Sequence, residues 1–137
     1  MHAPSLKAGL IGITLFALGT ATGLFAQSVT DSLQRVEHQR ADLSGASHME
    51  VIVSTAEYKP GESIDRHLHH GLEAAYVVQG AEVQVPGKDA MTLATGTSLL
   101  NLRDVKHAGF KVTGTTPLKL FTVHIVDKGA PLYDYGH

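Results

Sequence analysis

The chain of 137 residues contains no cysteine. This absence excludes disulfide frameworks, zinc sites built on thiolates, iron–sulfur clusters and cysteine nucleophiles. An excess of one charge is also missing, since 11 Lys and Arg stand against 13 Asp and Glu, for a formal net charge of −2. Nucleic-acid binding would need a basic face, which this balance does not supply. With 18% charged and 43% hydrophobic residues the chain is too apolar for a disordered tail, and its length suits one domain.

Residues 1–26 are predicted to be an export signal. Lys7 is their only charge, and an apolar stretch rich in Gly and Ala runs from Ala8 to Ala26, before the polar pair Gln27-Ser28. A basic start, an apolar middle and a small residue before a polar stretch are typical of a secretory signal peptide. We therefore expect cleavage after Ala26 and a periplasmic or secreted protein that leaves the membrane. The alternative is an uncleaved anchor, because the 19 residues from Ala8 to Ala26 just suffice to span a bilayer.

The rest of the chain has the pattern of short strands separated by turns. Residues 27–46 are polar and mixed and are predicted to form an N-terminal arm. From Met49 to Tyr58, β-branched and aromatic residues dominate, and Lys59-Pro60-Gly61 is a type II turn signal. Further strand-like runs follow at spacings of roughly ten residues, with Gly or Pro at the breaks, which favours an all-β sandwich or barrel over residues 47–128. Residues 129–137 are predicted to be a trailing tail.

Nine histidines are unusual in so short a chain, and two of them share one strand-like segment. One residue separates His67 from His69, so in a strand both side chains point to the same face. Glu73 follows beyond Gly71, where a turn can fold it back toward the same centre. Two imidazoles and a carboxylate suit a divalent Fe, Mn, Ni, Cu or Zn ion. The same alternation turns His70 away from this centre.

These residues resemble the signature of the cupin family. The first cupin motif is G-x5-H-x-H-x3-E-x6-G. Five residues of this chain match all of its positions: Gly61, His67, His69, Glu73 and Gly80.

The second cupin motif, G-x5-P-x-G-x2-H-x3-N, is matched in part. Gly96 and His107 have its spacing, while Leu102, Asp104 and Lys111 stand where Pro, Gly and Asn are usual. Asp tolerates many turn geometries, so this departure does not remove the histidine ligand. The resemblance covers about Met49 to Val126 and implies a small jelly-roll barrel of antiparallel strands with one metal ion. The ligands that it implies are His67, His69, Glu73 and His107.

Three further residues are candidates for the pocket around this site. His124 lies in a strand-like run on a face that could line the barrel, where it would be a pocket residue or a partner of the metal ligands, although the sequence favours a satisfied buried histidine there. Arg103 could attract an anionic substrate at the barrel mouth, although cations on a loop are more often solvated. Tyr76 is a weaker candidate. No catalytic residue and no organic cofactor follow from the sequence.

The ligand set leaves room for chemistry. Four protein ligands leave one or two open positions on a metal ion, and open positions distinguish catalytic sites from closed structural ones. The cupin resemblance implies dioxygenases, oxalate-degrading enzymes, isomerases and non-catalytic barrels. We expect an exported protein with a mononuclear site of three His and one Glu. If it is an enzyme, it is a metal-dependent dioxygenase or lyase acting on a small anionic or phenolic substrate.

The alternative is a barrel that binds or senses a small molecule or metal without turnover. Outside the cytoplasm copper and zinc bind most tightly by intrinsic affinity, so we expect zinc, copper or manganese more often than iron.

A barrel of this size also leaves sheet edges that need cover, and Gln34–Leu43 could add a strand to a partner's sheet. We therefore expect a homodimer, as many cupins are.

Overall fold

The computed structural model describes residues 31–136. The predicted signal segment, residues 1–26, and the predicted cleavage site lie outside the described residues. Between residues 31 and 136 no helix is long and apolar enough to cross a membrane. The strands of this part are β1 (Arg35–Asp42), β2 (Met49–Tyr58), β3 (Ser63–Ile64), β4 (Gly71–Gln79), β5 (Ala81–Gln84), β6 (Met91–Leu93), β7 (Ser98–Asn101), β8 (Phe110–Thr113) and β9 (Leu118–Asp127).

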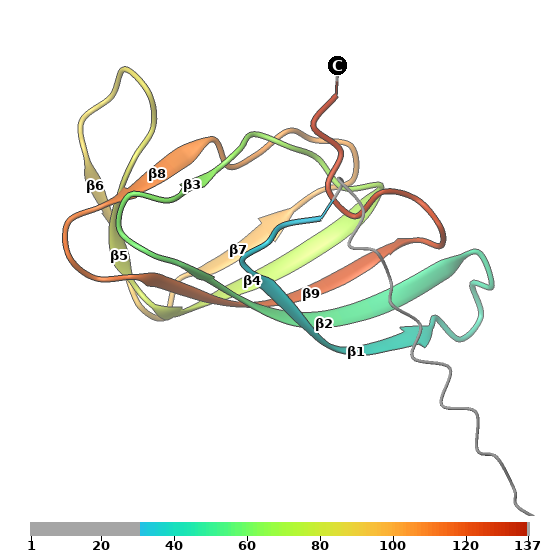
Figure 1. The fold of residues 1–137 in the computed structure, drawn as a ribbon. Coiled ribbons are helices and arrows are strands. Elements are labelled where there is room, and N and C mark those ends of the chain that lie inside the picture. Colours follow the sequence, from blue (N-terminus) through green and yellow to red (C-terminus); the bar gives the residue numbers. More distant parts are fainter. Residues whose placement is uncertain (1–30, 137) are drawn as a thin grey trace, which may run out of the picture.

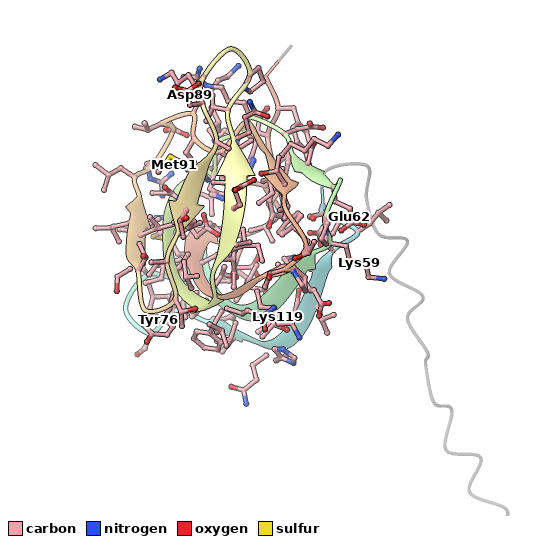
Figure 2. All side chains as sticks on the ribbon, turned by 90° about the vertical axis from the view of Figure 1, so that its left-hand side faces the viewer. Lys59, Glu62, Tyr76, Asp89, Met91 and Lys119 are labelled. Carbon is pink, nitrogen blue, oxygen red and sulfur yellow. The ribbon has the colours of Figure 1, made fainter. Side chains whose placement is uncertain are left out.

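The strands form two antiparallel sheets (Figure 1). The larger has the order β1-β2-β9-β4-β7, and the smaller has the order β3-β8-β5-β6. Seen from the end where β5 and β6 lie, the strands of both sheets surround one interior (Figure 2). The prediction of an all-β barrel of antiparallel strands is confirmed.

The segment β2 shows why these residues form strands. It spans the predicted Met49–Tyr58, its side chains alternate in burial, and it pairs with β9 along its whole length. In the turn after it, the N–H of Glu62 donates to the carbonyl of Lys59 at 2.9 Å, and Gly61 has a φ of +93°. A type II turn requires a positive φ at this position, which glycine adopts without strain. The turn prediction is also confirmed.

The interior changes character along the five-stranded sheet. Near the β2–β3 turn, Ala56, Leu120 and Val77 lie opposite one another on β2, β9 and β4. We call the buried cluster at this end the apolar end; it consists of Ala56, Tyr58, Ile64, Val77, Ala81, Val83, Val112 and Leu118. Farther along the sheet lies a second row of facing residues, Ile52, His124, Glu73 and Asn101 on β2, β9, β4 and β7. We call this row, together with the neighbouring His67, His69 and His107, the polar end.

Both ends of the described chain pack onto this framework. The strand β1 pairs with β2 of its own chain. After β9 the C-terminal segment, residues 128–136, turns back (Figure 1), and Leu68 and Asp134 exchange two backbone hydrogen bonds of 2.8 and 3.0 Å. Tyr133 in this segment is only 5% exposed. The C-terminal segment, which the sequence predicted to be a trailing tail, therefore covers part of the interior.

Candidate metal centre

Two loops bring three histidines together. His67 and His107 form an isolated antiparallel bridge, with backbone hydrogen bonds of 3.2 and 2.8 Å. His67 and His69 are 3% and 0% exposed, as expected for side chains on one inward face. The three ring centroids lie 4.5 to 4.9 Å apart. The predicted histidines therefore form one cluster.

Glu73 reaches this cluster from β4. The strand begins at Gly71, where a Cβ atom would lie 2.1 Å from the carbonyl oxygen of Ile125, so only glycine fits this approach to β9. The Oε2 atom of Glu73 lies 3.3 Å from Nε2 of His69 and 3.3 Å from Nε2 of His107. Neighbouring ligand atoms on an ion with bonds of about 2.1 Å are about 3 Å apart. The spacing thus fits a shared metal ion.

Backbone carbonyls orient the three imidazoles. The Nδ1–H groups of His67 and His107 donate to the carbonyls of Asp65 and Val105, at 2.7 and 3.1 Å. The Nδ1–H of His69 donates to the carbonyl of Leu132 in the C-terminal segment. A carbonyl can only accept, so each ring carries a proton on Nδ1, and in its neutral form Nε2 keeps its lone pair. Metal-binding histidines are commonly oriented in this way.

The free nitrogens are buried. Nε2 of His69 and Nε2 of His107 have no hydrogen-bond partner although both atoms are inaccessible to water. A buried polar atom without a partner costs free energy, and coordination of a metal ion would remove that cost. The donor set and these two atoms fit a divalent transition metal.

The charges of the cluster are those of a ligand set. Burial lowers the pKa of His67 to about 4, so its imidazole is neutral at neutral pH. Burial alone would raise the pKa of Glu73, but the close approach of His107, His124 and His69 outweighs it and holds that pKa well below its ordinary value. Burial also opposes protonation of His107, yet the Glu73 carboxylate and the Val105 carbonyl raise its pKa. A carboxylate anion beside the neutral imidazole of His67 suits a cation.

His124 is buried, as the sequence analysis favours. It is 0% exposed, and neither of its ring nitrogens has a hydrogen-bond partner within the described residues. Its Nε2 lies 3.4 Å from Oε1 of Glu73, and its ring centroid lies 4.7 Å from that of His69. His124 therefore adjoins the cluster.

Asn101 is a site residue that the sequence analysis missed. It lies opposite Glu73 on β7, and its Nδ2 donates to Oε2 of Glu73 at 2.6 Å. Strand alternation could have identified Asn101 from the sequence, because Leu99 and Asn101 share the partly buried face of β7. A polar amide on an inward face indicates a partner inside.

Two candidate pocket residues lie elsewhere. Tyr76 is 49% exposed and points outward from the ring of strands (Figure 2), where it borders a shallow surface depression with Leu100 and Phe121. Arg103 is exposed and donates to both carboxylate oxygens of Asp127, at 2.8 and 2.9 Å. The structure brings neither of them to the histidine cluster.

His70 turns away from the cluster, as expected. Its Nδ1 lies 2.9 Å from Asp104 and its Nε2 lies 3.0 Å from Asp134, so it links the loop before His107 to the C-terminal segment. Asp104, which stands at the usual glycine position of the second motif, has a φ of 59°. Asp reaches this left-handed conformation more readily than most residues, so the turn survives the substitution.

The cluster opens into a cavity of about 270 Å³. His67, Glu73, Asn101 and His107 line one part of it, and most of its wall is apolar. Met91, labelled in Figure 2, lines it and is 57% exposed, so the cavity reaches the surface near β6. Tyr133 lines the cavity too, with its ring centroid 4.5 Å from that of His67 and 5.1 Å from that of His69. The other apolar residues include Val83, Leu93, Leu99, Phe110 and Leu120.

The chain is thus a double-sheet barrel in which histidines and a glutamate converge to form a candidate metal site. The family model described as "Cupin domain" matches residues 54–124, slightly more than half of the chain. This chain belongs to the cupin family. No curated protein sequence matches it significantly.

Solved structures with a similar fold include two at a TM-score of 0.50. A conserved protein with a double-stranded β-helix domain from Klebsiella pneumoniae is 18% identical with a TM-score of 0.50, over 73% of this chain and 83% of that one. A cupin superfamily protein from Desulfitobacterium hafniense is 17% identical with a TM-score of 0.46, over 71% and 82%. The DMSP lyase DddQ from Ruegeria pomeroyi is 16% identical with a TM-score of 0.50, over 71% of this chain but only 49% of the lyase. At these identities the likeness concerns the fold alone.

Proposed function

We propose that this chain binds one divalent transition-metal ion through His67, His69, Glu73 and His107 and uses it to act on a small molecule. The observation that carries the proposal is that the ligand atoms of His67, His69 and His107 lie within 4.8 Å of one another, while Oε2 of Glu73 lies 3.3 Å from both His69 and His107. His67, Glu73 and His107 also line one part of the apolar cavity. An ion held there would polarise a substrate oxygen or orient the substrate for reaction with dioxygen. The chain's own contribution is to orient the three imidazoles through the backbone carbonyls at their Nδ1 atoms and to exclude water with the apolar wall.

The cavity wall favours a phenolic or enolic substrate over a small dianion. Among the described residues that line the cavity there is no Lys, Arg or Asp. A second negative charge on the substrate would therefore be buried without a partner, which is costly. Arg103, the cation expected at the mouth, is already paired with Asp127. An apolar body that carries one metal-binding end suits this cavity best.

Binding without turnover is the second candidate function. The described ionisable side chains of the cavity wall are the proposed ligands together with Tyr58 and Tyr133. Burial raises the pKa of Tyr58 and raises that of Tyr133 well above its ordinary value, so both phenols stay protonated. No free base stands beside the substrate space, and this observation favours a binding or sensing barrel.

Elemental analysis of the chain from Gln27, purified without chelator, is the first test. We expect about one transition metal per chain, lost in a His67→Ala/His107→Ala variant and retained in a variant with both exposed histidines His38 and His48 replaced by Ala. A stoichiometry near zero that added metal does not restore would overturn the metal site.

Oxygen uptake and substrate depletion with catechols and carboxylates then separate the two functions. Inactivity of fully metallated protein against both classes would favour binding.

We also propose that the chain is exported and loses residues 1–26. The support is the charge and hydropathy pattern of that segment. Metal loading outside the cytoplasm would favour zinc, copper or manganese. N-terminal sequencing of the native protein, together with its metal content, tests both points. An intact N-terminus or predominantly ferrous protein would contradict them.

A homodimer is the assembly that we propose. On the outer face of the five-stranded sheet Tyr76, Leu100 and Phe121 are 49, 61 and 40% exposed. The outer edge of β1 pairs with no strand among residues 31–136, so a partner's strand could extend the sheet there. Light scattering on the chain from Gln27 tests this, and a monomer mass would rule it out.

A further inference from the structure

The environment of His124 sets it apart from the other histidines of the cluster. Each of the three proposed ligands has its Nδ1–H bound to a backbone carbonyl, but neither nitrogen of His124 has a hydrogen-bond partner. His124 is fully buried and lies directly opposite Glu73 in the register of β9 and β4. The nearest polar atom recorded for its Nε2 is Oε1 of Glu73, 3.4 Å away. His124 therefore faces the carboxylate of Glu73.

The position of its ring argues against a fourth imidazole ligand. The rings of His67, His69 and His107 contact one another, with all three centroid distances below 5 Å. Within the described part of the chain, the ring of His124 contacts His69 and Tyr133 but neither His67 nor His107. The ligand atoms of His124, His69 and Glu73 lie within 4.8 Å of one another, so His124 meets the ligand set only on its His69 and Glu73 side. His124 lies beside the ligand set, on the far side of the Glu73 carboxylate.

The two oxygens of Glu73 have different neighbours. Oε2 faces the Nε2 atoms of His69 and His107 and accepts a hydrogen bond from Asn101. Oε1 faces His124. A small closure of the 3.4 Å gap would let Nε2–H of His124 donate to Oε1 and leave only Nδ1, an acceptor, without a partner. An unpaired ring acceptor is a smaller defect than an unpaired N–H donor in the same place.

We propose that His124 is a positioning residue that holds Oε1 of Glu73, so that this carboxylate binds the metal through Oε2 alone. This inference rests on the proposed metal site. With one bond from Glu73 and three from histidines, a six-coordinate ion keeps two open positions, whereas a bidentate carboxylate would occupy one of them. His124 thus selects for substrates that chelate through two adjacent oxygens, such as a catechol or an α-hydroxy ketone with an apolar body.

The test uses the full chain from Gln27 loaded with Mn²⁺ as the probe. X-ray absorption counts the imidazoles on the metal, and water-proton relaxation counts the exchangeable waters. In the wild type we expect three imidazoles and two waters. In His124→Phe, which keeps the ring volume and removes the donor, we expect three imidazoles and a relaxation enhancement lowered by about half. His124→Gln, whose amide N–H can replace the donor, is expected to restore it, and His38→Gln on exposed β1 is the matched control.

The outcomes separate the two proposals. Failure of the wild type to hold Mn²⁺, zinc or copper in stoichiometric amounts would overturn the metal site itself. A metal held by four imidazoles would leave the metal site standing and overturn the role given to His124. An unchanged water count in His124→Phe would also overturn it. If His124→Phe does not fold, the imidazole and water counts of the wild type still decide, because four imidazoles or a single water contradict the proposal.

Discussion

The apolar end and the polar end of the interior share the strands β2, β4 and β9 with the same inward alternation, yet they are stabilised differently. At the apolar end, Val83 and Val112 of the smaller sheet cover Val77 and Leu118 of the larger one. At the polar end, loops and the C-terminal segment provide the cover, and several buried nitrogens have no partner. Apolar side chains need only packing contacts to be stable in the interior. Buried polar atoms need hydrogen-bond or metal partners, and at the polar end several lack one that a ligand could supply. Packing is therefore concentrated at the apolar end, where Ala56, Tyr58, Ile64 and Val83 also line the cavity, and the candidate metal site lies at the polar end.

Metal addition should have the largest effect. The polar end gains its missing partners only when an ion binds, so saturating zinc should raise the free energy of unfolding by about 4 kcal/mol at a thousandfold excess over Kd. Urea unfolding with zinc and with chelator measures the difference. In His67→Ala/His107→Ala the difference should vanish. An equal gain in that variant would mean that the metal acts elsewhere.

A truncation at the apolar end should come next and should leave metal binding alone. Val77 and Val78 are neighbours on β4, but Val77 is 0% exposed and Val78 is 51% exposed. Val77→Ala removes two buried carbons and leaves a cavity, which costs about 2 kcal/mol, while Val78→Ala should change stability by no more than about 0.5 kcal/mol. Urea unfolding checks both values. Metal affinity should match the wild type in both variants, and a large loss in Val77→Ala would show that the two ends are coupled.

The two ends also differ in how far the sequence could predict them. The strands of the apolar end followed from β-branched runs and turn signals, and Met49–Tyr58 was predicted to the residue. The positions of His67 and His69 followed from alternation. Asn101 and His124 were not assigned to the metal site because their roles depend on the register of β4, β7 and β9, which local patterns do not determine. Tyr133 was missed because only tertiary contacts hold its segment in place.

The hydrogen bond from Asn101 to Glu73 should have a moderate effect, confined to the polar end. Without the amide donor, Oε2 of Glu73 loses one of the groups that orient it, and changes of this kind typically weaken metal affinity at least tenfold. We expect Asn101→Leu, which keeps the side-chain volume, to lower zinc affinity about tenfold, or about 1.4 kcal/mol, in a competition titration with a chelating dye. Ser98→Ala on the exposed face of β7 serves as the control. Unchanged affinity in Asn101→Leu would show that the bond is dispensable.

The smallest effect should come from the charged contacts that hold the cover of the polar end. Hydrogen bonds to Asp104, and secondarily to Asp134, raise the pKa of His70 above its ordinary 6.5. A raised pKa in the folded state means that this stabilisation is complete below pH 6.5 and is lost as the pH rises through the folded-state pKa. His70→Asn should therefore lower the melting temperature of the metal-free protein slightly near pH 6 and hardly at all near pH 9. Since the groups are exposed, screening keeps the effect small, and high salt should reduce it further. Val77→Ala at the apolar end is the control, because it should lower the melting temperature equally at both pH values. If His70→Asn also lowered it equally at both, His70 would act by packing rather than by charge.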